Sequence, residues 1–363
     1  MVATAVGATG APEAPAFQKL DVFAQALSYI ENNYVDAVDD EALMYGAVKG
    51  MVGKLDRFST FLPPEEYRRL REDTEGEYGG VGIVVEADDQ GVPVVVDVVP
   101  KSPADRAGLQ VADRILAIDG VATAGTDQNW RGTLRGVAGT RVNVEVQRTH
   151  WIKTKQVSLV RERIRTHPVE ARTLDQGVAY VRIRQFQGST TADVRKQLRA
   201  AKKKGGGAVP GLVLDLRGNP GGLFEQAVSV ADLFLEEGLI VTVKSRLGQI
   251  EEHSAHVAGT WTGFPMTVIL DQGSASSAEI VAGALQDHGR AVIVGTPSFG
   301  KGSVQTFLSL DDGSGLKLTT SRYYTPDGRS IEGSGIVPDT LVERSDEQVE
   351  TAYQTLHTLG LSN

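Results

Sequence analysis

The spacing of hydrophobic residues changes twice along the chain and divides it into three regions. In residues 17–75, apolar side chains recur every three or four positions, which predicts amphipathic helices. In residues 76–160 they alternate with polar residues or form β-branched runs, which predicts strands. In residues 161–345, short apolar runs typical of buried strands alternate with helical stretches, and hairpins follow from about residue 304. The pattern predicts a multidomain chain of α/β and α+β class, with a helical segment, a β-rich domain and an α/β core.

The two ends of the chain carry less of this pattern. Residues 1–16 are rich in Ala, Gly and Pro and hold one charged residue, Glu13, which predicts a flexible leader. They lack the basic start and the long apolar stretch of a complete export signal, so we expect that such a signal is missing from this sequence. Residues 346–363 are expected to form a C-terminal helix or tail.

Composition narrows the classes of function. The 363 residues are 41% hydrophobic and 23% charged, as in ordinary globular proteins, which excludes disorder as the main state. The net charge of -9 argues against nucleic acid as the main partner. The absence of cysteine excludes disulfides, thiolate catalysis and cysteine-type zinc sites. No apolar run is long enough to span a membrane.

Two predicted strand-to-helix turns, residues 215–222 and 273–279, are rich in glycine and polar residues. Such turns expose backbone N–H groups at a helix N-terminus, where they can bind an anion or a developing oxyanion. Ser276 falls at the start of the second helix and is a candidate nucleophile. The segment from Ser276 to Glu279 also fits a capping box, however, and the residues alone favour the cap.

Two other candidate sites are weaker. Residues 295–302 nearly match a phosphate-binding loop, but Gly302 replaces the hydroxyl residue that would hold magnesium. The residues after it alternate like a strand, whereas a phosphate-binding loop opens a helix, so nucleotide binding is disfavoured. The six histidines form no H-E-x-x-H pair, and we predict no metal. A Ser-His-Asp triad stays open, because triads assemble in space.

The β-rich region resembles a PDZ domain. The likeness rests on residues 79–83 (G-G-V-G-I), 102–109 (S-P-A-D-R-A-G-L) and 113–120 (D-R-I-L-A-I-D-G). PDZ domains bind peptide C-termini as an added strand, while backbone N–H groups of a glycine-containing loop hold the terminal carboxylate. The alternative is that the glycines only make a tight turn. The resemblance assigns the carboxylate loop to Gly80, Val81, Gly82 and Ile83.

The region after the PDZ domain resembles the serine peptidases of the carboxy-terminal processing, or tail-specific, family. Three stretches carry the likeness in the family's order: residues 215–222 (D-L-R-G-N-P-G-G), 274–279 (S-A-S-S-A-E) and 299–305 (F-G-K-G-S-V-Q). The helical segment matches too, and the PDZ domain has the family's usual place. The likeness covers nearly the whole chain after residue 17.

This resemblance assigns catalytic roles position by position. It implies that Ser276 is the nucleophile, that Lys301 is the general base and that Gln305 holds the lysine amine. It further implies that the backbone N–H groups of Gly218 and Ser277 form the oxyanion hole.

The sequence departs from the family pattern at two places. Ser277-Ala278 stands where the family usually has Ala-Ser, which puts a second hydroxyl beside Ser276. Arg57-Phe58 stands where the family usually has Pro-His, a change without a clear consequence at the level of sequence.

A lysine base is chemically coherent. A serine needs a base to become nucleophilic, and a lysine near its free pKa is protonated at neutral pH and cannot accept a proton. Burial disfavours the charged form and lowers the pKa, so a desolvated Lys301 could take the proton of Ser276 and later give it to the leaving amine. The alternative is a surface lysine in a glycine turn.

The resemblance implies an endopeptidase that cuts protein substrates near their C-terminus, selects them with its PDZ domain and needs no cofactor. Arg135, ahead of the last predicted PDZ strand, is the candidate for linking peptide binding to the peptidase core. The alternative is a solvated surface arginine. The likeness leaves room for an adaptor protein, for association with the cell envelope and for a homo-oligomer, and it argues for the periplasm or cell envelope as location.

Two functions from other classes are alternatives to this one. The first is a non-catalytic PDZ adaptor that binds peptides and carries a degenerate peptidase core. The intact set of Ser276, Lys301 and Gln305 argues against it. The second is a nucleotide-binding protein, which the incomplete phosphate-binding loop disfavours.

Overall fold

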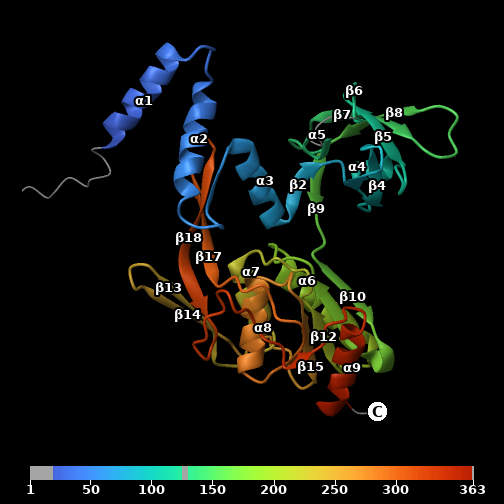
Figure 1. Ribbon diagram of the computed structural model, residues 1–363. Helices are drawn as coiled ribbons and strands as arrows, with labels where there is room; N and C mark the ends of the chain where they lie inside the picture. Colours follow the sequence, from blue (N-terminus) through green and yellow to red (C-terminus); the bar gives the residue numbers. More distant parts are fainter. Residues whose placement is uncertain (1–18, 125–129, 362–363) are drawn as a thin grey trace, which may run out of the picture.

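The three predicted regions are present in the structure, a computed structural model that describes residues 19–124 and 130–361 (Figure 1). A helical N-terminal segment, a β-rich domain and a mixed α/β core follow one another along the chain, so the predicted fold class is confirmed. The predicted leader, residues 1–16, lies outside the described residues. None of the described helices combines the length and the apolar character needed to cross a bilayer.

The N-terminal segment consists of the helices α1 (Leu20–Asn33), α2 (Asp40–Val52) and α3 (Pro64–Glu75). Asp39 caps α2, because its side chain accepts a hydrogen bond from the Ala42 N–H at 3.1 Å. Helix α1 buries none of its side chains and lies apart from the β-rich domain and the core (Figure 1).

A short strand joins this segment to the core. Strand β1 (Thr60–Leu62) lies between α2 and α3 and pairs with β18 (Gly315–Tyr324), with Thr60 opposite Lys317. Strand β18 also pairs with β17 (Ser303–Ser309), which forms the hairpin predicted after residue 304. Residues from opposite ends of the chain therefore share one sheet.

Within its described residues, 76–124 and 130–165, the β-rich domain contains short strands and two short helices. Its elements are β2 (Glu77–Gly80), β3 (Ile83–Ala87), β4 (Pro93–Val98), α4 (Pro103–Arg106), β5 (Arg114–Ile118), β6 (Val121–Ala122), α5 (Trp130–Leu134), β7 (Arg141–Gln147), β8 (Lys155–Val160) and β9 (Glu162–Arg165). The sheet order is β3-β4-β5-β7-β8, and β2 pairs with β9 where the chain enters and leaves the domain. Alternate residues fill the interior: Val142 and Val144 are fully buried, whereas Asn143 between them is exposed.

The core is built from two sheets and the helices that cover them. Its remaining elements are β10 (Val169–Thr173), η2 (Asp175–Gly177), β11 (Ala179–Ile183), α6 (Thr190–Lys204), β12 (Leu212–Asp215), α7 (Phe224–Asp232), β13 (Leu239–Ser245), β14 (Ile250–Ser254), β15 (Met266–Leu270), α8 (Ser277–Asp287), β16 (Val292–Gly295), β19 (Thr340–Leu341) and α9 (Gln348–Thr358). The larger sheet has the order β10-β11-β12-β15-β16-β19, parallel from β11 onward. The smaller sheet has the order β1-β18-β13-β14, with β17 also on β18.

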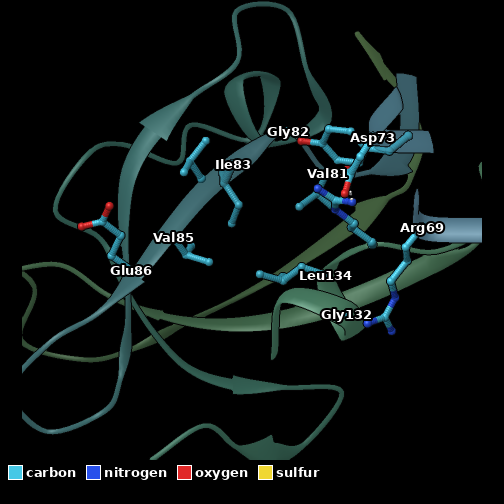
Figure 2. A pocket seen from close by; sticks show the side chains of 12 residues that line it. Arg69, Asp73, Val81, Gly82, Ile83, Val85, Glu86, Gly132 and Leu134 are labelled. Atoms are coloured by element: carbon cyan, nitrogen blue, oxygen red, sulfur yellow. Dashed lines mark hydrogen bonds and ion pairs between the residues drawn. The ribbon is translucent and has the colours of Figure 1, made fainter. Parts of the chain in front are cut away.

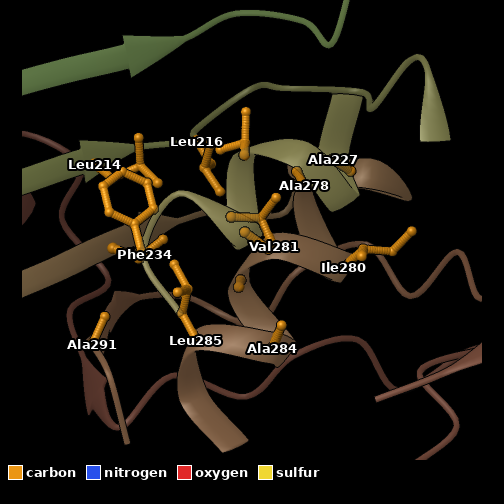
Figure 3. Close-up of a cluster of buried hydrophobic side chains, with 14 of the residues drawn as sticks. Leu214, Leu216, Ala227, Phe234, Ala278, Ile280, Val281, Ala284, Leu285 and Ala291 are labelled. Atoms are coloured by element: carbon orange, nitrogen blue, oxygen red, sulfur yellow. The ribbon is translucent and has the colours of Figure 1, made fainter. Parts of the chain in front are cut away.

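Helices cover both faces of the larger sheet, which explains why its central strands β12 and β15 are buried along their whole length. Leu212 and Leu214 of β12 join the buried cluster formed with α6, α7 and α8, part of which Figure 3 shows. Val213, between them, belongs to the separate cluster under α9 on the other face. The central strands are thereby fixed from both sides, and so are the turns that leave their carboxyl ends.

Candidate active site

A cavity of about 360 Å³ lies where the turns after the parallel strands β12 and β15 meet. In open α/β sheets, ligands bind at this edge, outside the carboxyl ends of the strands. The two turns touch, because the Ala275 N–H donates to the Asn219 carbonyl oxygen at 2.9 Å. Among the residues that line the cavity are Ser276, Ser277, Lys301, Gln305, Gly221, Gly222, Lys317 and Tyr323.

Ser276 is the residue before α8 and has a backbone conformation that is rare for a residue with a side chain. Its φ is 54° and its ψ is -113°, and such a conformation costs about 1–3 kcal/mol. The Ser276 N–H donates to Glu279 Oε2 at 2.7 Å, so the glutamate half of the predicted capping box is present. A strained turn between a strand and a helix is the way α/β-hydrolases expose their nucleophilic serine at the sheet edge.

The two neighbouring serines use their hydroxyls to hold the turns together. Ser274 is fully buried, and its Oγ donates to the Leu216 carbonyl oxygen at 2.9 Å. Ser277 Oγ donates to the Gly222 carbonyl oxygen at 3.1 Å. The Ser277 hydroxyl, which lies beside Ser276 in the sequence and is an alternative nucleophile, is therefore already hydrogen-bonded to the glycine turn.

The two predicted oxyanion donors lie in different surroundings. The Ser277 N–H stands at the N-terminus of α8, where the helix favours negative charge. Gly221 packs against this turn, and a Cβ atom there would lie 2.8 Å from the Ser276 Cβ. The Gly218 N–H instead donates to Asp271 Oδ1 at 2.8 Å. Gly218 is not among the described residues that line the cavity.

Lys301 lies in the loop between β16 and β17. Its backbone N–H donates to Glu279 Oε2 at 2.9 Å. Its ammonium group lies over the ring of Phe58, 5.0 Å from the ring centre. Within the described part of the chain, no hydrogen bond joins this ammonium to Ser276 Oγ. The structure brings the two side chains into one cavity without connecting them directly.

The surroundings of Lys301 favour the neutral amine. Burial lowers the pKa of Lys301 below its usual range, and the nearby charge of Lys317 lowers this pKa further. Glu279, Glu332 and Asp56 act in the opposite direction. Burial is the largest influence, so the net shift is in the direction that a general base requires.

Gln305 brings an unused acceptor to the cavity. Its Nε2 donates to Thr319 Oγ1 at 2.7 Å. Its Oε1 is buried, and it has no hydrogen-bond partner within residues 19–124 and 130–361. A buried acceptor without a partner costs about 1–3 kcal/mol, so an ammonium or amine donor would be stabilised here.

Several residues of the site carry no functional signal in the sequence. Phe58 belongs to the departure from the family's Pro-His, and in the structure its ring contacts the Lys301 ammonium. Tyr323 is buried, its phenol donates to the Lys301 carbonyl oxygen, and burial raises its pKa well above the usual value. Nothing near Lys317 or Tyr323 in the sequence marks them, because β18 brings them to the cavity from another sheet.

A second cavity, of about 560 Å³, runs along β3 in the β-rich domain (Figure 2). Strand β3 is at the edge of its sheet and faces α5 across the cavity. Gly82 has a φ of +82°, and a Cβ atom there would lie 2.2 Å from the Ser102 Cβ. Gly80 ends β2 and does not line the cavity, whereas the other three predicted loop residues do. The residues lining the cavity include Val81, Gly82, Ile83, Val85, Leu134, Arg69, Asp73, Arg135 and Glu86.

Arg135 follows α5 and contacts the helical segment. Its Nη1 lies 2.8 Å from Asp73 Oδ1 on α3, and its guanidinium lies 4.3 Å from the centre of the Tyr78 ring. Arg135 is therefore a partly buried residue at a domain junction, and its ion-pair partner belongs to α3.

Comparison with known proteins assigns a family to each part of the chain. Residues 177–342 match the family described as Peptidase family S41, and residues 94–148 match the PDZ domain. Residues 3–65 match the family described as the activating protease CtpB N-terminal domain. These matches follow the order of the helical segment, the β-rich domain and the core.

Relatives that match most of this chain belong to the same family of peptidases. A carboxy-terminal-processing protease of Bartonella bacilliformis is 38% identical over 353 residues, covering 95% of this chain and 80% of that protein. The carboxy-terminal processing protease CtpA of Bacillus subtilis is 34% identical over 331 residues, covering 90% and 70%. A solved photosystem II D1 C-terminal processing protease superposes with a TM-score of 0.54 at 31% identity, covering 94% of this chain and 92% of that chain.

The likeness extends over the core, the PDZ domain and the turns that meet at the cavity, and it includes relatives that match nearly the whole chain. The protein therefore belongs to the S41 family of carboxy-terminal processing serine peptidases and carries a PDZ domain within its chain.

Proposed function

We propose that this peptidase uses Ser276 as the nucleophile and Lys301 as the general base. The observation that carries the proposal is the shared cavity, which Ser276, Lys301 and Gln305 line together although they come from different loops and strands. Two further observations support it. The hydroxyls of Ser274 and Ser277 are engaged elsewhere, and the burial of Lys301 lowers its pKa.

In the proposed reaction, the neutral Lys301 amine takes the proton of Ser276 Oγ as this oxygen attacks the substrate carbonyl carbon. The Ser277 N–H stabilises the resulting oxyanion, and the Gly218 N–H becomes a second donor when it is released from Asp271. Lys301 then gives its proton to the leaving amine. Water hydrolyses the acyl-enzyme, with Lys301 again as the base.

The position of the Lys301 ammonium on Phe58 supports a resting form that must rearrange. Catalysis requires Nζ to reach hydrogen-bond distance of Ser276 Oγ. A cation–π contact stabilises a position by about 0.5–2 kcal/mol, which a bound substrate can overcome. The unpartnered Oε1 of Gln305 is the acceptor that would hold the amine in its new place.

The PDZ domain is proposed to select substrates by their free C-terminus. The cavity runs along β3, the strand that ends the sheet order, and a peptide can be added to a sheet as a strand at such a position. Its walls include Val81, Ile83 and Leu134, which suit an apolar terminal side chain. The backbone N–H groups of the loop around Gly82 would bind the terminal carboxylate.

This proposal is tested by comparing two protein substrates that differ only at the terminus. The substrate with a free apolar C-terminal carboxylate is expected to be cut about tenfold faster at low concentration than the same chain ending in an amide, because the amide lacks the charge that the loop binds. The measurement is the initial rate of cleavage by mass spectrometry. Equal rates for the two substrates would rule out recognition of the C-terminus.

Arg135 is proposed to couple peptide binding to activity. Its ion pair with Asp73 connects the wall of the peptide groove to α3, and α3 follows β1, which pairs with the hairpin of the active site. Arg135 and Asp73 both line the groove, so a bound peptide can disturb their ion pair while the loop around Gly82 holds its carboxylate. A bound peptide can shift the equilibrium between the resting and active forms only if it binds the two forms with different affinity.

The expected result for Arg135→Ala is turnover about tenfold slower, a size typical of coupling between sites. The affinity of the full chain for a fluorescent C-terminal peptide is expected to change little, because the backbone N–H groups of the loop remain. Arg71→Ala is the matched control, since Arg71 pairs with Glu75 on the exposed side of α3. Unchanged turnover in the Arg135 variant would remove this residue from the coupling.

The location and the partners are further proposals. Family resemblance supports the periplasm or cell envelope. Membership of the family and the PDZ domain imply protein substrates. An adaptor protein that docks beside the PDZ groove is compatible with this arrangement. Exposed apolar side chains on α1, such as Val22, Phe23 and Ile30, support a homo-oligomer.

A further inference from the structure

The side chain of Glu279 has no exposed surface and collects four hydrogen-bond donors. It lies in the first turn of α8, directly behind the serine turn. A buried carboxylate is costly unless donors surround it, and hydrogen bonds to a charged acceptor are the stronger kind. The four donors are the Ser276 N–H at 2.7 Å and the Lys301 N–H at 2.9 Å on Oε2, and the Gly300 N–H at 2.7 Å and the Ser298 Oγ at 2.6 Å on Oε1.

One oxygen of this carboxylate holds the backbones of both proposed catalytic residues. The N–H groups of Ser276 and Lys301 both donate to Oε2, although these residues lie on separate loops. The bond to Ser276 also stabilises its unusual backbone, with a φ of 54°. A helix cap would explain this bond, but it would not explain the three donors from residues 298–301.

We propose that Glu279 is a positioning residue for the reaction, which fixes the loop of Lys301 to the turn of Ser276. The inference rests on the proposed Ser276–Lys301 pair and deepens it. Without the carboxylate, the strained serine turn can relax and the lysine loop can move independently. A misplacement of about 1 Å in such a pair can cost about 100-fold in rate.

The charge of Glu279 gives this role a signature that a purely structural residue lacks. Glu279 acts on Lys301 by its negative charge and raises the lysine pKa, as do Glu332 and Asp56, while burial and Lys317 lower it. Removal of the Glu279 charge therefore lowers the pKa of Lys301. The neutral amine then forms at lower pH, so the rise of kcat with pH moves to lower values.

The first test is Glu279→Gln in the full chain. The amide has the size of the carboxylate, but its NH2 group faces N–H and O–H donors and cannot accept from them. We expect kcat to fall about 100-fold while KM changes by less than about threefold. The pH at which kcat reaches half of its maximum is expected to move down.

The second test is Glu279→Asp, which keeps the charge but is one methylene too short to reach all four donors. Its kcat is expected to fall at least about tenfold. The pH at which kcat reaches half of its maximum is expected to stay that of the parent enzyme. Glu350→Gln is the matched control. Glu350 also lies in the first turn of a helix, α9, but it is exposed, and its loss is expected to leave both kcat and the pH midpoint close to those of the parent.

Three results would overturn the inference. They are a kcat of Glu279→Gln within about threefold of the parent, a loss of kcat without the downward shift in pH midpoint, or parental kcat in Glu279→Asp. Circular dichroism checks folding, and if Glu279→Gln does not fold, the aspartate variant decides. If instead the Ser276→Ala enzyme keeps its activity, the proposed catalytic pair fails, independently of Glu279.

Discussion

Replacement of Ser276 by alanine is expected to reduce peptidase activity to background, a fall in kcat of more than about 1000-fold. The alanine removes the proposed nucleophile and leaves no oxygen at that place to form the acyl-enzyme. Digestion of unfolded casein, followed by gel or mass spectrometry, measures the effect. The fold should survive, because the backbone N–H of residue 276 still donates to Glu279 and the surrounding core is unchanged.

The serines on either side are the matched controls for this experiment. Ser274→Ala loses the bond to the Leu216 carbonyl and is expected to cost about 1 kcal/mol of stability while keeping substantial activity. Ser277→Ala loses the bond to the Gly222 carbonyl but keeps the backbone N–H proposed for the oxyanion hole. Loss of activity only in the Ser277 variant would move the nucleophile to that residue.

Replacement of Lys301 by alanine is expected to have a comparable effect, because no other base is proposed for the Ser276 hydroxyl. In the parent enzyme, kcat should rise with pH through the pKa of Lys301, since only the neutral amine accepts a proton. Burial and Lys317 lower this pKa, which places the rise below the usual range of a lysine. The measurement is kcat against pH at saturating substrate.

Two variants separate the lysine mechanism from a histidine triad. His288 binds the Leu239 carbonyl through Nε2 at 2.7 Å and is not among the described residues that line the active cavity, so His288→Ala should behave like the parent. Lys317→Gln removes the second cation, which raises the pKa of Lys301 and moves the rise of kcat to higher pH. An inactive His288 variant with an active Lys301 variant would establish a conventional triad.

The sequence could predict those helices, strands and turns that are determined by residues close together in the chain. The apolar run before Asp215 is a strand covered on both faces, and the glycine turn after it and the serine turn before α8 meet as parallel strands require. The resemblance also led to Ser276 and Lys301, which share a cavity. These features depend on a few adjacent residues, so their signal is present in the sequence.

Features that depend on distant parts of the chain could not be predicted. The sequence presented Glu279 as the end of a capping box, yet three of its four donors come from residues 298–301. The resemblance assigned the Gly218 N–H to the oxyanion hole, and the sequence does not show that this N–H donates to Asp271 in the structure. Arg135 was the candidate for linking peptide binding to the core, and the sequence does not show that its ion-pair partner is Asp73 on the helical segment. No local pattern records such partners, because the fold creates them.

The pairing of β1 with β18 bears on how the enzyme is made. Thr60 leaves the ribosome well before Lys317, so strand β1 must wait for the synthesis of the whole segment between them before it finds its partner. Domains fold as units during synthesis, which allows the PDZ domain to form before β17 and β18 exist. The cavity obtains Gln305, Lys317 and Tyr323 only from that last hairpin. A nascent chain therefore lacks three of the residues that line this cavity until β17 and β18 have been synthesised.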